Sequence, residues 1–185
     1  VDDLIATDDS EEMVMMMLRG SDLQGVLVDD AVHPAAAPDD LDNTLKSVSR
    51  IADGNGYDSW IMFNVYAQRA TDPDDMDKRL NPTLHEENMR AFEYILGLYG
   101  EGLKPAVWAA WGTIIEKRPY LADCVRDMIA IGERYGAQWL SVGRISAKGH
   151  PHHPLYLRKD EKTAPFDIEA YVSALQATKR EKARA

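Results

Sequence analysis

Three histidines lie within nine residues near the end of the chain, in the stretch GHPHHPLYL (149–157). His150 and His153 each precede a proline, and His152 stands between them. Such histidines could ligate a metal ion, bind phosphate or stabilise a developing anion, or simply shape a surface loop. The His-x-His spacing suits a metal, but no third ligand follows at a good spacing, so we predict no metal site. Ligand binding by the three histidines and a purely structural loop remain the alternatives.

A second polar group lies in the stretch FNVYAQRATDP (63–73). Asn64 falls near the end of a continuous apolar run, where a buried amide can read a planar ligand edge with one donor and one acceptor. Arg69 carries the fixed donor fork that binds phosphate or carboxylate. The structural alternatives are that Asn64 ties down its own loop and that Arg69 pairs with a neighbouring aspartate.

The stretch VDDAVHPAAAPDD (28–40) offers two carboxylates and a histidine. Asp29 and Asp30 could activate a water as general bases. They could equally serve turns and helix caps, as aspartates in such a loop often do. His33 could bind a ligand or cover the loop.

The stretch AAWGTIIEKRP (109–119) and the cations ahead of the histidines complete the set of candidate loops. Trp111 could stack on a base or belong to the core, and Gly112 could let the backbone approach a ligand closely. Arg144 and Lys148 could hold phosphates. Neither a glycine-rich phosphate fingerprint nor the glycine–x–serine–x–glycine elbow of hydrolases occurs, and we predict no cofactor.

Alternating apolar and amphipathic segments must position these loops. Short apolar runs of strand length predict four strands, and apolar residues at three- and four-residue spacing predict helices. The predicted strands are 25–32, 59–67, 105–112 and 137–143, and the predicted helices are 39–56, 83–100, 120–136 and 166–185. Thr83 with Glu86 resembles a capping box at the start of the second helix.

This alternation predicts a three-layer α/β/α sandwich with a central, mainly parallel four-stranded sheet. Ligands bind such sheets beyond the carboxyl ends of the strands. Each candidate loop follows a predicted strand, so we expect the polar side chains of these loops to share one site. We expect a single α/β/α domain over 25–175, preceded by an acidic segment (1–24) and followed by a basic tail (176–185).

The formal net charge of the 185-residue chain is −10 at pH 7, and it is unevenly distributed. Residues 1–42 hold twelve acidic residues and one basic residue, whereas residues 43–185 hold nineteen acidic and twenty basic residues. A nucleic-acid partner needs a basic face, which the whole-chain charge opposes and the C-terminal third permits. The acidic N-terminus is either a solvated segment or an arm that shields a basic site.

Two further features bear on the compartment. No run of about 18 apolar residues occurs, so we expect no membrane span. Cys124 is the only cysteine, which rules out an intramolecular disulfide and a cysteine-based zinc site. A cytoplasmic location is the default expectation, and the sequence leaves the oligomeric state open.

The runs WIMFNVYAQRATDP, VWAAWG and GHPHHPLYL, followed by APF, resemble in type and order the blocks of a bacterial and phage family, domain of unknown function 1643. The resemblance covers about residues 26–170, and the middle and last blocks are specific. The family's first block has asparagine, proline and serine where this chain has His33, Pro34 and Ala35. The family implies no activity.

The order of the blocks is also similar to that of the uracil-DNA glycosylase superfamily. That similarity implies a glycosylase-like fold in which Asn64 matches a base-reading asparagine. His153 with the following proline and leucine, or His150 with its proline, matches a late segment that supplies a catalytic histidine and contacts DNA. Asp29 or Asp30 would stand near the family's water-positioning acid, although the aspartate–proline motif of that loop is absent.

The superfamily resemblance implies recognition of a nucleobase in nucleic acid, with hydrolysis of the N-glycosidic bond as the activity. Asn64 would read the edge of the base, Tyr66 or Trp111 would stack on it, and His153 would stabilise negative charge on the departing base. An acid, Asp29 or Asp30, would stabilise the sugar cation or position the water. Phosphates would be held by three cations, Arg69, Arg144 and Lys148. A module that binds a nucleotide without cleaving it, and a protein-interaction domain with a vestigial pocket, are the alternatives.

Overall fold

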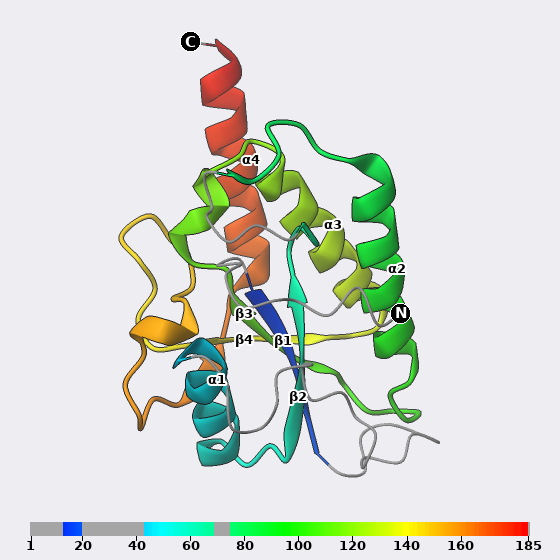
Figure 1. Ribbon diagram of the computed structural model, residues 1–185, viewed down its shortest axis with the longest axis vertical. Coiled ribbons are helices and arrows are strands. Elements are labelled where there is room, and N and C mark those ends of the chain that lie inside the picture. The colour runs from blue at the N-terminus through cyan, green and yellow to red at the C-terminus, as the bar shows by residue number, and fades with distance from the viewer. Residues whose placement is uncertain (1–12, 20–42, 69–74, 185) are drawn as a thin grey trace.

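The computed structural model describes residues 13–19, 43–68 and 75–184, without the side chains of 180–184 (Figure 1). This part of the chain forms one five-stranded sheet and four α-helices. The strands are β1 (Met13–Leu18), β2 (Ser59–Asn64), β3 (Ala106–Ala110), β4 (Gln138–Val142) and β5 (Thr163–Pro165). The helices are α1 (Asn43–Gly54), α2 (Pro82–Gly97), α3 (Leu121–Arg134) and α4 (Ile168–Arg184), with 3-10 turns η3 (Gly112–Glu116) and η4 (Pro154–Tyr156).

The sheet is mixed, with strand order β2-β1-β3-β4-β5. Strand β1 runs antiparallel to both β2 and β3, β3 runs parallel to β4, and β4 runs antiparallel to β5. The prediction of a mainly parallel, four-stranded sheet is therefore wrong, although the α/β class is confirmed. The predicted strand 25–32 lies outside the described residues.

Strand β1 (MVMMML) was placed by the sequence within the acidic N-terminal segment, yet it is the strand between β2 and β3. All six of its side chains are buried. Met13, Met15 and Met17 face the layer that holds α1, whereas Val14 and Met16 face the core shared with α2, α3 and α4. A run that is apolar at every position fits a strand covered on both faces.

Helices cover both faces of the sheet, as predicted. The apolar side of α1, with Val48 and Ile51, packs on one face. The other face carries α2, α3 and the first half of α4, which meet around Phe92, Val125 and Tyr171. The C-terminal end of α4 extends beyond the rest of the molecule (Figure 1). None of the helices in the described ranges is long and apolar enough to cross a membrane.

The predicted segments match the observed ones in kind, with shorter bounds. The predicted strands 59–67, 105–112 and 137–143 correspond to β2, β3 and β4, and the four predicted helices correspond to α1 to α4. Strand β5 was missed, because it has only three residues and ends at Pro165, which offers little periodic signal.

The N-terminus of α2 differs from the predicted capping box. Asn81 is the N-cap, and its side-chain oxygen accepts from the backbone N–H groups of Thr83 (3.1 Å) and Leu84 (3.3 Å). Pro82 occupies the first turn, where its missing N–H costs nothing. The capping box of Thr83 with Glu86 is therefore wrong, because the helix begins two residues earlier than that motif requires.

We expect Asn81→Ala to lower the free energy of unfolding by about 1 kcal/mol, because it removes the acceptor for two first-turn N–H groups. Thr83→Ala is the matched control and should change it by less than about 0.5 kcal/mol. Urea unfolding followed by circular dichroism measures both. A larger loss for Thr83→Ala than for Asn81→Ala would restore the capping box.

Candidate functional site

The carboxyl ends of β2, β3 and β4 share one edge of the sheet. Because β1 is antiparallel to both of its neighbours, β2 and β3 are parallel to each other, and β4 follows β3. At this edge Met13 pairs with Asn64 on one side and with Ala110 on the other. Two strand spacings, roughly 10 Å, therefore separate the Cα atoms of Asn64 and Ala110. The loops after these strands start close together, as the sequence led us to expect.

Asn64, at the end of β2, points to the face of the sheet that packs on α1. Side chains alternate along a strand, and Trp60 and Met62 lie on that same face. The Asn64 side chain is buried, with 6% of the residue exposed, and its Oδ1 has no hydrogen-bond partner among the described residues. Its backbone oxygen accepts from Nδ2 of Asn88, on α2, at 2.8 Å. The end of β2 is thus held from the opposite face, which leaves the Asn64 amide oxygen available.

The histidine loop crosses the edge beside the end of β3. The N–H of Gly112 donates to the carbonyl of Pro151 at 3.1 Å. Gly112 has a positive φ of 59°, and a Cβ built there would lie 3.4 Å from the Cβ of His153. Glycine at this position therefore lets the backbone of the histidine loop come close to β3.

The same loop is fastened to α1. Ser47 donates from Oγ to the carbonyl of Pro154 at 2.7 Å, and Nη2 of Arg50 donates to that Oγ at 3.0 Å. His153 immediately precedes this contact and forms the N-cap of η4. The contact with α1 places His153 on the α1 side of the sheet, which is also the side that Asn64 faces.

The protonation of His153 follows from its contacts. Nδ1 accepts from the N–H of Leu155 at 3.2 Å, so the ring proton of the neutral form lies on Nε2. Burial lowers the pKa of His153 to about 4, which keeps the ring neutral near pH 7. Nε2 is buried and has no partner in the described ranges, with 8% of the residue exposed. His153 therefore presents a neutral, unused N–H donor.

His150 lies in a buried polar chain that joins the loop to α4 and η3. Trp111 donates from Nε1 to the hydroxyl of Tyr171 at 2.8 Å, and that hydroxyl lies 2.9 Å from Nδ1 of His150. Nε2 of His150 lies 3.0 Å from Oε1 of Glu116, whose Oε2 accepts from Lys148 at 2.5 Å. The ionised carboxylate of Glu116 can only accept, so Nε2–H donates to it, and Nδ1 of the neutral ring accepts from the hydroxyl of Tyr171.

Hydrogen bonding and burial within this polar chain shift the pKa values of Glu116 and Tyr171. Hydrogen bonds from Lys148 and then from His150 lower the pKa of Glu116, so the carboxylate stays ionised. Burial raises the pKa of Tyr171, so its hydroxyl stays protonated as a donor. Both nitrogens of the His150 ring have partners within the fold, so this chain of hydrogen bonds fixes the position of the ring.

The two aromatic rings predicted to stack on a ligand are core residues. Tyr66 is fully buried, its hydroxyl accepts from the N–H of Asn81 at 3.0 Å, and its ring meets Tyr120 edge-on at 5.0 Å. Trp111 is also fully buried and packs against Phe166 and Tyr171. Neither ring offers an open face to a ligand in this arrangement.

The remaining predicted residues are more scattered. Arg144 is exposed, His152 is partly buried, and Lys148 is engaged by Glu116. Asp29, Asp30, His33 and Arg69 lie outside the described residues. Within the described ranges, no three histidine, cysteine or acidic side chains gather closely enough to hold a metal ion.

Sequence reasoning missed several residues that shape the site. Ser47 and Asn88 are polar residues on the buried sides of α1 and α2, a signal that the helical pattern could have supplied. Glu116 and Tyr171 carry no such signal, because each meets His150 only through contacts distant in sequence.

Comparison with known proteins yields one match. A family model described as protein of unknown function (DUF1643) matches residues 31–155, a range that includes Asn64 and all three histidines of the late loop. No curated protein and no solved structure matches the chain. The likeness to the uracil-DNA glycosylase superfamily is therefore not confirmed.

Proposed function

We propose that this chain, which belongs to the DUF1643 family, binds a nucleobase with Asn64 and His153. One observation carries the proposal: of the six buried side-chain polar atoms that lack partners among the described residues, two of opposite kind, Oδ1 of Asn64 and Nε2–H of His153, lie at or after the carboxyl ends of the strands. Both belong to the α1 side of the sheet at the edge where β2 and β3 end. A native fold rarely leaves such atoms unused, since each costs about 1–3 kcal/mol when buried without a partner.

The chemistry of the two atoms favours a planar heterocycle. The acceptor of Asn64 suits a ring N–H, and the donor of His153 suits a ring carbonyl, so one edge of a base supplies both complements. Because His153 is neutral, the site does not demand a phosphate or carboxylate at that position. This argues for a base rather than for an anionic group as the part of the ligand held there.

The neutral donor of His153 also favours a second step, release of the base. If water attacks C1′ of the sugar, the C1′–N bond breaks and its electron pair leaves with the base. A donor already aimed at a base carbonyl would stabilise that negative charge. Asp29 or Asp30 remains the proposed carboxylate, which would accept the proton that the attacking water loses or stabilise the positive charge on the sugar.

Binding is tested by titrating the protein with the nucleosides of the four DNA bases and of uracil, and with single-stranded oligonucleotides that carry them. We expect Asn64→Ala and His153→Asn each to weaken binding roughly 10- to 100-fold, the loss of one hydrogen bond to a buried partner. Asparagine at position 153 keeps an acceptor for the N–H of Leu155, and its shorter side chain carries no donor at the position of Nε2.

His85→Asn is the matched control, because the ring of His85 also has a buried unpartnered nitrogen, but on α2, away from this edge. It should leave binding unchanged. Release of the base in the same samples, abolished by both site variants, would add catalysis. Binding without release would identify a recognition module, and equal binding by wild type and both site variants would refute the proposal.

A further inference from the structure

Tyr156 is an exposed aromatic ring on a fixed backbone. It is 73% exposed, the highest value among the large hydrophobic residues of the described ranges. The turn η4 that carries it begins with Pro154, and Ser47 of α1 holds the carbonyl of that proline. The N–H of Tyr156 donates to the carbonyl of His153 at 3.2 Å. The ring is therefore exposed to solvent on an ordered turn. On a flexible loop, the same ring could fold back onto the protein surface.

The exposed ring adjoins the proposed base site. The ring centroids of His153 and Tyr156 are 6.0 Å apart, with 59° between the ring planes. His153 is buried and Tyr156 is open, so the two rings lead from the interior of the site to the surface. Successive bases of a single strand are spaced on this scale and can stack on an aromatic face.

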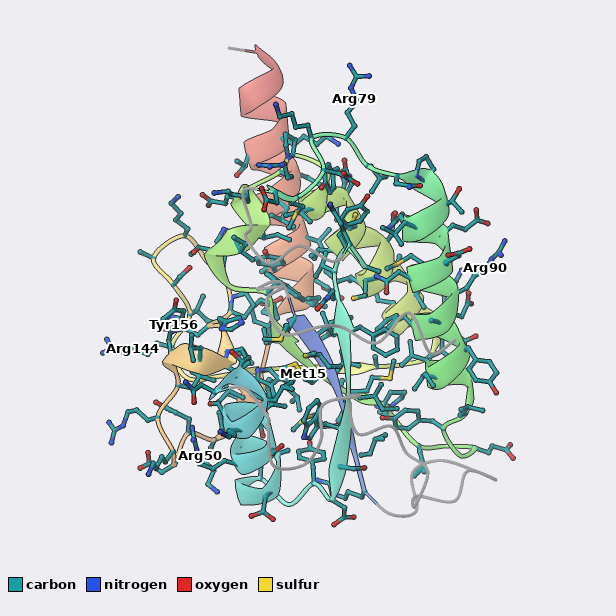
Figure 2. All side chains as sticks on the ribbon, viewed as in Figure 1. Met15, Arg50, Arg79, Arg90, Arg144 and Tyr156 are labelled. Carbon is teal, nitrogen blue, oxygen red and sulfur yellow. The ribbon has the colours of Figure 1, made fainter. Side chains whose placement is uncertain are left out.

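The surroundings of Tyr156 are apolar and basic. Leu155 and Ile145 are exposed large hydrophobics in the same loop region. Arg144 lies on the same side of the molecule as Tyr156, and both point outward beside η4 (Figure 2). Arg144 has neither an ion pair nor a hydrogen bond with the rest of the described chain. A cation on the same side of the molecule as an exposed aromatic ring suits a nucleic-acid strand, whose phosphates bind cations and whose bases stack on aromatic rings.

The local charge supports the same partner. From Arg144 to Lys162 the chain has five basic and two acidic residues, although the chain as a whole is acidic. Lys148 is paired with Glu116, and Arg158 lies 3.7 Å from Asp160, whereas Arg144, on the same side of the molecule as Tyr156, has no such acidic partner among the described residues. The excess of basic over acidic residues in this segment therefore favours binding of a phosphate.

We propose that Tyr156 and Arg144 form a binding surface for single-stranded nucleic acid, which extends the base site outward. Tyr156 stacks on the base next to the one held by Asn64 and His153, and Arg144 contacts a phosphate between them. This inference rests on the proposed function and names its substrate class: a single strand, whose unpaired bases expose their faces, rather than a free base or a duplex.

The probes are a 12-nucleotide single strand that contains the four DNA bases and uracil, the same strand in a duplex, and the five corresponding nucleosides. We expect Tyr156→Ala to weaken binding of the single strand about tenfold and to leave nucleoside binding within about twofold. Tyr156→Phe should bind like wild type, because the stacking face is kept. Arg144→Gln should weaken single-strand binding and lower the slope of log affinity against log salt by about 1.

Matched controls exist elsewhere on the surface. Tyr94, on α2, is 67% exposed, and Arg79 is an exposed arginine distant from η4 in Figure 2. Tyr94→Ala and Arg79→Gln should change neither affinity nor salt slope. All four positions are at the surface, so the variants should remain folded by circular dichroism.

The outcomes separate the two proposals. No loss with Tyr156→Ala, equal loss with Tyr94→Ala, or duplex binding as tight as single-strand binding would overturn the stacking surface, even where Asn64→Ala and His153→Asn weaken nucleoside binding. Single-strand binding that depends on Tyr156 but not on Asn64 or His153 would support the surface and overturn the proposed base site.

Discussion

Replacing Met15 with alanine is expected to lower the free energy of unfolding by about 2–5 kcal/mol, the cost of emptying a large buried side chain in a core. Met15 is fully buried at the middle of β1, where it pairs with Met62 of β2 and Trp108 of β3. Its side chain packs into the layer between the sheet and α1 (Figure 2). Neighbours on both strands hold this space open, so the protein cannot easily collapse around the shorter side chain.

Met62→Ala is the matched control for that experiment. Met62 lies opposite Met15 on the same face, but it is only partly buried because β2 is an outermost strand of the sheet. Its replacement should cost less than half as much in urea unfolding. A loss for Met15→Ala no larger than that for Met62→Ala would mean that β1 does not lie between β2 and β3.

Acid is expected to destabilise the protein through His153 by about 3 kcal/mol between pH 7 and pH 4. Burial lowers the folded-state pKa of this residue to about 4, whereas an unfolded histidine titrates near 6.5. Between these values the unfolded chain binds a proton that the folded chain does not, so acid favours unfolding. The contribution is complete above about pH 6.5 and is lost as the pH falls towards 4.

The measurement is the free energy of unfolding at pH 7 and pH 4.5, for wild type and His153→Asn. Other groups also titrate in this range, so the difference between the two proteins isolates His153. The variant should have the smaller loss, because asparagine does not titrate. Parallel pH dependences would show that the pKa of His153 is the same in the folded and unfolded states, and would contradict a folded-state pKa of about 4.

The helices and the strands β2, β3 and β4 could be predicted because each has a local signal. The continuous apolar run before Asn64 and the regular spacing in α3 belong to single elements, and burial on both faces leaves that pattern in the sequence. Strand direction has no such signal. Nothing within MVMMML states that it runs antiparallel between two strands from much later in the chain.

The candidate site was predictable in part for the same reason. Asn64 and His153 could be chosen because each is a polar residue at the end of an apolar run or between prolines, and the structure brings both to one side of the sheet. The roles of Trp111 and His150 could not be predicted, because they depend on Tyr171, which is distant in sequence. The contacts of Tyr66 with Tyr120 and Asn81 could not be predicted either, because both partners are distant in sequence.

The position of β1 has a consequence for biosynthesis. Met13 must wait for Ala110, its partner on β3, which the ribosome adds almost 100 residues later. At about 5–20 residues per second, six consecutive apolar residues emerge and stay unpaired on that side for roughly 5–20 seconds. Such a segment is the kind that binds chaperones or other nascent chains during synthesis. The strand that is buried on both faces in the folded protein is therefore an exposed apolar segment during synthesis.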